Sequence, residues 1–238
     1  LAIANRKSAL DEAESARAAG APHLDLSLPG RKPQRGRAHI ISQILDQMVD
    51  ILMELGFQVA SGPDVENEYY NFDALNTPAD HPARDSHDTF YLQNGLLLRT
   101  HTSPVQMRVM ESMQPPVAII APGRTYRVDW DASHSPNFFQ IEGLLVDKGV
   151  SFADLKGTVG YFMRRLFGPH AKTRFRPHFF PFTEPSAEMD VSCAVFKGKG
   201  CRVCKHSGWL EILGCGMVDP AVFKYANYDY ETYTGFAF

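Results

Sequence analysis

Apolar residues recur every three or four positions in the segment that begins at His39. They are Ile40, Ile41, Ile44, Leu45, Met48, Val49, Leu52 and Leu55. This period places the apolar side chains on one face of a helix, and Gly56 is a typical residue at which a helix ends. The pattern therefore predicts an amphipathic helix from about His39 to Gly56.

Other helices are predicted from their start signals. A short polar side chain placed just before a proline, or three residues before an acid, can cap the first free N–H groups of a helix. Such signals stand at Ser103–Pro104, at Ser151 with Asp154, and at Asp219–Pro220. We expect the second of these helices to run through Phe167.

Strand-like segments alternate with these helices. They cover residues 57–66, 96–98, 117–147, 174–193 and 208–218. Most of them are joined as hairpins, which predicts an α+β fold with an antiparallel sheet flanked by helices. A long loop rich in His and Asp, residues 71–92, lies among them, and loops of this length inside a compact domain tend to be functional.

The first residues differ in character from the rest. Residues 1–20 predict one helix closed by Gly20, either a surface helix or the stub of a longer helical arm, and the abrupt start favours the arm. A stretch rich in Pro, Gly and Arg follows and predicts a linker. We therefore expect residues 1–36 to form a helix and linker and residues 37–238 to form one large domain. The chain lacks an initial Met and stops in a strand-like pattern, so we expect both ends to be cut.

Composition narrows the function classes. The 238 residues are 44% hydrophobic and 21% charged, as is ordinary for a globular protein, and the net charge of −3 argues against coating nucleic acid through bulk charge. No apolar run reaches the length of a membrane span, and the N-terminus lacks the apolar core of a signal peptide. All four cysteines fall within residues 193–215, which suits a reducing cytoplasm better than a disulfide framework.

The segment of residues 123–147 carries the most informative chemistry. It predicts a strand, a polar loop and a return strand, with the polar residues Arg127, Asp129, Asp131, His134, Gln140 and Glu142. Because side chains on a strand repeat every two residues, Gln140 and Glu142 should point to the same face. A cation together with amide and carboxylate groups on one hairpin suits the binding of a zwitterion beside a phosphate.

Several segments occur in the order found in one family. They are GFQVASGPDVE, HPARDSHDTFYL, LLLRTHTSPVQ, GRTYRVDWDASHSPNFFQIEGL, RFRPHFFPFTEPSAE and GWLEILGCGMVDP. With the helix from His39, which is similar to class II motif 1, this set resembles the alpha subunits of bacterial phenylalanine–tRNA ligases. The resemblance runs from about Leu26 to Phe238 and implies a class II aminoacyl-tRNA synthetase core.

The resemblance also implies a reaction and partners. Phenylalanine and ATP would form phenylalanyl-adenylate with Mg²⁺, and the phenylalanyl group would then pass to the 3′-terminal adenosine of tRNA(Phe). The family works with a beta subunit, usually as an alpha2-beta2 heterotetramer in the cytoplasm, and the beta subunit carries the proofreading site.

Residue roles follow by matching the family's motifs. Arg127 matches the motif 2 arginine, whose guanidinium would stabilise charge on the α-phosphate. Asp129 and His134 belong to the loop that reaches toward ATP and the tRNA end in the family, although a lone loop histidine such as His134 is more often simply exposed to solvent. Gln140 and Glu142 match the positions that receive the substrate ammonium.

Two neighbours of the ammonium site have an alternative interpretation. His101 and Ser103 lie close to Gln140 and Glu142 in the family, yet both could simply cap the helix that starts at Pro104. The Ser103 hydroxyl could also do both.

The remaining matches concern the substrate ring and the metal. Phe180 and Phe182 would pack against the ring, although both could be ordinary core residues in a chain with 16 phenylalanines. Ala237 matches a small residue at the far end of the ring. Glu184 matches a glutamate that binds Mg²⁺ jointly with the beta subunit, or it is a surface charge.

Two departures from the family are visible. The chain stops at GFAF, where the family continues into motif 3 and an arginine that stacks on adenine, so this stretch alone should bind ATP poorly. A rival interpretation follows: a non-catalytic class II-like module that binds an amino acid or RNA and regulates a partner. The missing arginine favours this rival, whereas Arg127, Gln140, Glu142 and Glu184 favour the enzyme.

The second departure is in the cysteine region. Some relatives carry two CxxC pairs there, a strong zinc pattern, whereas Phe196 replaces one cysteine of the first pair in this chain. Zinc on Cys193, Cys201 and Cys204, completed by His206, is one interpretation. Buried or free thiols are the other, and the incomplete pattern favours them.

Overall fold

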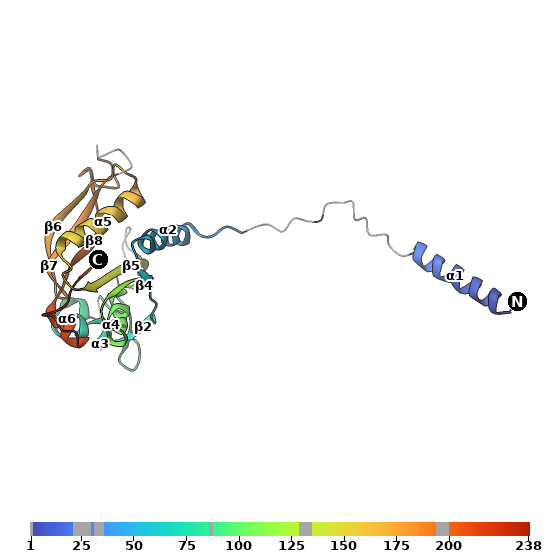
Figure 1. Cartoon of the computed structure of the whole chain (residues 1–238), viewed down its shortest axis with the longest axis horizontal. Helices are drawn as coiled ribbons and strands as arrows, with labels where there is room; N and C mark the ends of the chain where they lie inside the picture. The colour runs from blue at the N-terminus through green and yellow to red at the C-terminus, as the bar shows by residue number, and fades with distance from the viewer. Residues whose placement is uncertain (1, 21–29, 31–35, 86–87, 129–134, 194–199) are drawn as a thin grey trace. The chain divides into compact units, whose positions relative to one another are not determined.

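The computed structural model describes residues 2–20, 30, 36–85, 88–128, 135–193 and 200–238 (Figure 1). The chain divides into two compact units, Leu1–Ala38 and His39–Phe238. The first contains helix α1 (Ala2–Gly20), which buries none of its residues. No helix in the described ranges combines the length and the apolarity that crossing a bilayer requires.

A seven-stranded sheet forms the centre of the second unit. Its strands are β1 (Gln58–Val59), β4 (Val117–Tyr126), β5 (Asn137–Asp147), β6 (Thr173–Phe180), β7 (Thr183–Ser192), β8 (Trp209–Val218) and β9 (Thr234–Ala237). They lie in the order β1-β4-β5-β9-β8-β7-β6. All neighbours are antiparallel except β1 and β4, so the predicted α+β fold is confirmed, with one parallel pair added.

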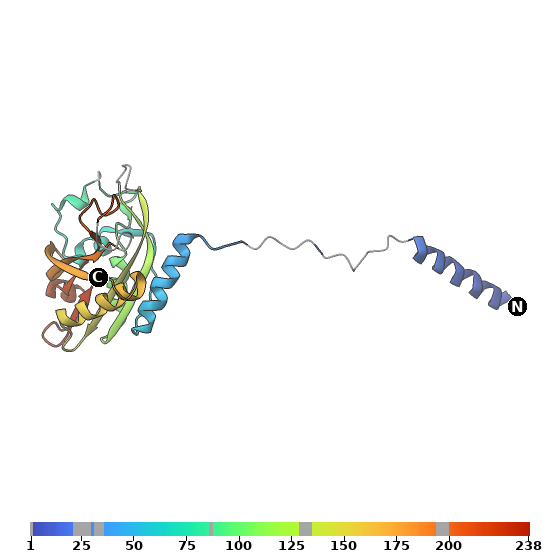
Figure 2. The same cartoon turned by 90° about the horizontal axis from the view of Figure 1, so that it is seen from above.

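Helices α2 (Ile40–Glu54) and α5 (Phe152–Phe167) lie side by side along one face of this sheet (Figure 2). Leu52, Phe162 and Met163 are fully buried against the strands there. Both helices begin where the sequence predicts. Ser151 and Asp154 form a complete capping box, in which each side chain accepts from the backbone N–H of the other.

Helices α4 (Ser103–Ser112) and α6 (Pro220–Tyr225) contribute to a second core on the other face. Ile119 and Ile120 of β4 alternate between the two cores, as the pleat requires. A small antiparallel sheet of β2 (Val65–Asn67) and β3 (Leu96–Leu98) precedes α4 in the chain.

The predicted long loop of residues 71–92 is more structured than expected. It begins at the end of α3 (Glu68–Asn71) and includes the 3-10 turns η1 (Asp73–Leu75) and η2 (Pro82–Arg84). Ala74 and Leu75 of η1 are buried in the second core, so part of the segment is packed in the protein interior.

Candidate functional site

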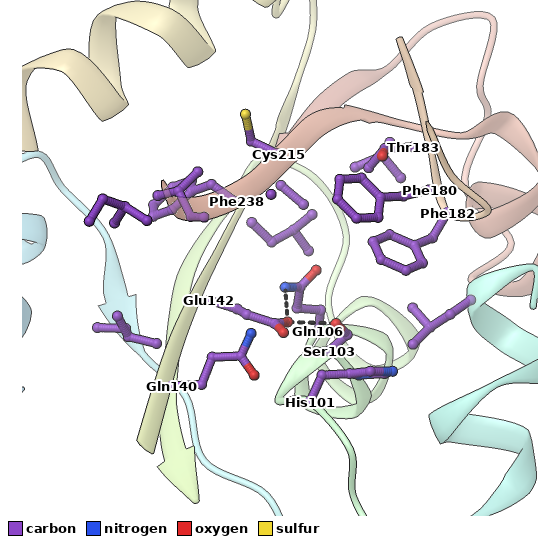
Figure 3. Close-up of a pocket in the computed structure, with 18 of the residues that line it drawn as sticks. His101, Ser103, Gln106, Gln140, Glu142, Phe180, Phe182, Thr183, Cys215 and Phe238 are labelled. Carbon is purple, nitrogen blue, oxygen red and sulfur yellow. Dashed lines mark hydrogen bonds between the residues drawn. The ribbon is translucent and has the colours of Figure 1, made fainter. Parts of the chain in front are cut away.

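A cavity of about 550 Å³ opens between the β4–β5 hairpin, the start of α4, the β6–β7 turn and strand β8. Its size is within the range of small-molecule sites. Figure 3 shows two groups of side chains across it. We call the first the polar wall: His101, Ser103, Gln106, Gln140 and Glu142. We call the second the aromatic wall: Phe180 and Phe182.

Glu142 is the centre of the polar wall. Its carboxylate accepts hydrogen bonds from the Ser103 hydroxyl at 2.6 Å and from Gln106 Nε2 at 3.0 Å (Figure 3). All three residues are buried. Burial raises the pKa of Glu142 to about 7, although the Ser103 hydrogen bond opposes the rise. The carboxylate is therefore held in place but lacks a paired cation of its own in the described contacts, and a ligand cation would relieve that cost.

Two further atoms of the polar wall lack partners. Gln140 Oε1 and His101 Nδ1 are buried and make no hydrogen bond within the described part of the protein. Burial and then the nearby charge of Arg127 lower the pKa of His101 to about 3, so its ring is neutral at neutral pH. Because unpaired buried polar atoms are costly, these atoms favour a polar ligand or water in the cavity.

Arg127 directly follows β4 and lines the same cavity. Its Nε donates to the Thr100 carbonyl at 3.1 Å, and its guanidinium carbon lies 5.1 Å from the centre of the Phe138 ring. These two contacts orient an exposed guanidinium beside the polar wall. A planar cation in this position can bind a carboxylate or a phosphate through two parallel hydrogen bonds.

The buried side chain of Arg99 stabilises the β4–β5 hairpin. Arg99 donates from Nε to the Arg124 carbonyl at 2.8 Å and pairs with Asp64 at 3.0 Å. It can approach because residue 123 is glycine: a Cβ there would overlap the Arg99 guanidinium. Arg99 thus fixes the strand whose end carries Arg127.

The aromatic wall is shaped by ring contacts. Phe180 ends β6 and Phe182 lies in the following turn, and their rings are stacked with centroids 5.7 Å apart. Phe180 occupies space left by Gly214 of β8, where a Cβ would collide with the ring. Ala237 of β9 also lines the cavity. This side is therefore suited to a flat apolar group.

The structure brings together eight of the predicted site residues around one cavity. They are Arg127, His101, Ser103, Gln140, Glu142, Phe180, Phe182 and Ala237. Asp129 and His134 lie outside the described residues. Glu184 at the start of β7 is exposed and does not line the cavity, although the neighbouring Thr183 does.

The capping interpretation of Ser103 is wrong. Thr102 is the N-cap residue of α4 and makes no side-chain cap hydrogen bond, while the Ser103 hydroxyl is used by Glu142. Gln106 is a residue of the polar wall that was not predicted from the sequence. Its spacing offered a signal, because residues three apart on a helix share a face and Ser103 was already a candidate.

Comparison with known proteins gives the family. The family model described as "tRNA synthetases class II core domain (F)" matches residues 23–238. This chain belongs to that family. All residues that line the cavity lie within the stretch that this family model matches.

Two curated relatives of this class II core are each named "Phenylalanine--tRNA ligase alpha subunit". The one from Syntrophus aciditrophicus is 60% identical over 215 residues, covering 90% of this chain and 64% of the relative. The one from Geotalea daltonii is 59% identical over 227 residues, covering 95% and 67%. The chain thus spans slightly less than two thirds of the first relative's length.

A solved structure shares the fold of the class II core. The pyrrolysyl-tRNA synthetase of Desulfitobacterium hafniense superposes with a TM-score of 0.60 at 14% identity, covering 84% of this chain and 66% of that one. At this identity the similarity concerns the fold alone.

Proposed function

We propose that the chain carries the phenylalanine-activating site of a phenylalanine–tRNA ligase alpha subunit, with residues 37–238 as its catalytic core. The observation that supports this most strongly is a buried carboxylate, without an ion-pair partner among the described residues, that lies across one cavity from a stacked phenylalanine pair. An amino acid with an ammonium at one end and an aromatic ring at the other matches both walls.

The polar wall would hold the ammonium. Glu142 supplies the charge, and Gln140 Oε1 offers an acceptor that has no hydrogen-bond partner among the described residues. The ring would then lie against Phe180 and Phe182, with Ala237 limiting the depth of the pocket. A hydrophobic pocket excludes an added hydroxyl only about a hundredfold, so discrimination against tyrosine would depend on that depth and on a separate editing site.

Arg127 would act on the other substrate. Attack of the phenylalanine carboxylate on the α-phosphate of ATP builds negative charge on the phosphoryl oxygens. An oriented guanidinium stabilises that charge more in the transition state than in the ground state. Asp129 and His134, which lie outside the described residues, would contribute from the stretch of chain after Arg127.

Mg²⁺ would accompany ATP, and Glu184 is the residue of this chain that would hold an ion. Its exposed carboxylate is a hard oxygen ligand of the right kind. Within the described residues Glu184 belongs to no group of three or more side chains that could hold a metal ion. This fits an ion whose remaining ligands come from the beta subunit, substrate phosphates or water. A beta subunit, in an alpha2-beta2 assembly, and tRNA(Phe) complete the proposed set of partners.

The test is phenylalanine-dependent exchange of pyrophosphate into ATP, using the complete alpha chain assembled with its beta subunit. We expect exchange with phenylalanine and at least about a hundredfold less with tyrosine. We also expect Arg127→Ala to abolish exchange while phenylalanine binding, measured by calorimetry, is retained.

The competing proposal, a non-catalytic module that binds an amino acid or RNA, predicts a different result. Such a module would bind phenylalanine or RNA without any exchange. Equal exchange with every amino acid would also contradict the proposed function. Loss of folding in Arg127→Ala, seen by circular dichroism, would assign that residue a structural role.

A further inference from the structure

The β7–β8 hairpin holds a cysteine cluster that the proposed reaction does not use. Cys193 follows the last residue of β7, and Cys201 and Cys204 lie in the turn that precedes β8. Thr183, at the opposite end of β7, lines the cavity. Ten residues of strand separate the two ends, about 30 Å, so the cluster is far from the substrate site.

The three sulfur atoms have the spacing of metal ligands. Cys193 Sγ lies 3.7 Å from Cys201 Sγ, and Cys201 Sγ lies 3.8 Å from Cys204 Sγ. All three sulfurs are within 4.8 Å of one another. A tetrahedral zinc ion with Zn–S bonds of about 2.3 Å places its sulfurs about 3.8 Å apart. The sulfurs are too far apart for a disulfide, whose bond is about 2.05 Å.

The backbone around the cluster is shaped for sulfur ligands. The Cys201 N–H donates to Cys204 Sγ at 3.0 Å, which favours the thiolate form that binds metal. Gly200 has φ +85°, and a side chain there would collide with the carbonyl of His206. The His206 N–H in turn donates to the Cys201 carbonyl at 2.8 Å, which closes the turn.

Ordinary core packing explains the cluster poorly. Cys193, Cys201 and Cys204 are at most 7% exposed, yet the described apolar residue packed against them is Leu210 alone. Among the residues that the structure describes, three small side chains and one leucine bury little apolar area, whereas a shared ion would tie both ends of the hairpin together.

We propose that Cys193, Cys201 and Cys204 bind one Zn²⁺ that clamps the β7–β8 hairpin, with water in the fourth position. His206 does not complete the site, because its side chain is exposed and outside the group of ligand atoms. Residues 194–199 contain no Cys, His, Asp or Glu. The site is structural, and the ion takes no part in substrate activation.

The test measures the zinc content of the protein and the absorption spectrum of its cobalt-substituted form. It uses the complete alpha chain assembled with its beta subunit. We expect about one zinc per alpha chain by mass spectrometry of the metal, released when an organomercurial blocks the thiols. Apoprotein given Co²⁺ should show sulfur-to-cobalt charge transfer in the near ultraviolet and the intense visible bands of a four-coordinate site.

Single substitutions test which side chains bind the zinc ion. Cys204→Ser should lower bound zinc at least about tenfold, whereas Cys215→Ser, which changes a buried thiol outside the cluster, should retain it. His206→Ala should also retain it; loss of zinc there would overturn the three-thiolate site.

If Cys204→Ser does not fold, thiol titration of the unaltered protein decides the question. Zinc should protect three thiols per alpha chain from reaction, and chelation should expose them. Equal thiol reactivity with and without zinc, or a mass two units lower from a disulfide, would overturn the proposal.

Discussion

The two walls of the cavity are built by different means. The polar wall is held by directed hydrogen bonds between α4 and β5, with Ser103 and Gln106 fixed on Glu142. The aromatic wall is held by shape, since Phe180 stacks on Phe182 over the space left by Gly214. The polar wall can therefore select a ligand by its charge, and the aromatic wall can select it by its shape. Changes to each should therefore alter different measurable quantities.

The largest effect is expected from Glu142→Gln. Removing one partner of a buried charge pair costs about 2–5 kcal/mol, so kcat/KM for phenylalanine in the exchange reaction should fall about 30- to 5,000-fold. Glu111→Gln is a matched control, because Glu111 bonds Tyr70 on the outside of α4 and does not line the cavity. An unchanged kcat/KM in Glu142→Gln would remove Glu142 from the site.

The same variant should stabilise the free protein. The pKa of Glu142 is raised from 4.5 to about 7, so the folded state binds its proton more tightly than the unfolded state. The free energy of unfolding therefore falls as pH rises from about 4.5 to 7, and above pH 7 the ionised carboxylate costs up to about 3 kcal/mol. Gln carries no charge, so Glu142→Gln should raise Tm at pH 8 and have little effect at pH 4.

A smaller effect is expected on the aromatic wall. Phe182→Leu removes a ring contact and some apolar area, together about 2 kcal/mol, so KM for phenylalanine should rise about 30-fold. KM for ATP and the pH dependence should stay unchanged, which separates this wall from the polar one. Phe179→Leu is the control, since that side chain is 69% exposed and outside the cavity. An equal rise in KM for phenylalanine in Phe182→Leu and Phe179→Leu would contradict the separate role of the aromatic wall.

The unaltered protein should show a pH effect of about tenfold. Glu142 must be ionised to pair with an ammonium, and with a pKa of about 7 its ionised fraction rises roughly tenfold between pH 6 and pH 8. KM for phenylalanine should therefore fall about tenfold over this range, measured by exchange at saturating ATP. A flat profile would mean that another group carries the charge.

The smallest effect is expected from a change to Gln106, a neighbour of Glu142 in the polar wall. Gln106→Met removes one donor from the Glu142 carboxylate, and a hydrogen bond to a charged group contributes about 1.5–3 kcal/mol. The midpoint of the KM profile should move upward by about one to two pH units, with kcat unchanged at high pH. Weaker binding by the same factor at every pH would show that Gln106 acts by contact rather than through Glu142.

The sequence predicted the elements whose signals are local. The apolar period from Ile40, the capping box at Ser151 and the alternation of Gln140 with Glu142 each depend on residues a few positions apart. These gave the two helices on one sheet face and the hairpin with its polar side chains in the correct places.

Features that depend on distant partners were harder to predict. The parallel pairing of β1 with β4 joins residues about sixty positions apart, and η1 is ordered by the core it enters. For Ser103 the strong local signal left a capping role open beside the ligand contact, yet the hydroxyl donates to Glu142, 39 residues away. The cysteine cluster likewise needed a folded turn to bring Cys193 to Cys201.

Arg99 has a consequence for local unfolding. Its N–H donates to the Asp64 carbonyl and its carbonyl accepts from the Tyr126 N–H, while its side chain bonds Arg124. The small β2–β3 sheet and the end of β4 cannot open separately without breaking these bonds. Their amide hydrogens should therefore exchange with deuterium as one cooperative unit, and a ligand at the neighbouring polar wall should slow that exchange even in strands it does not touch.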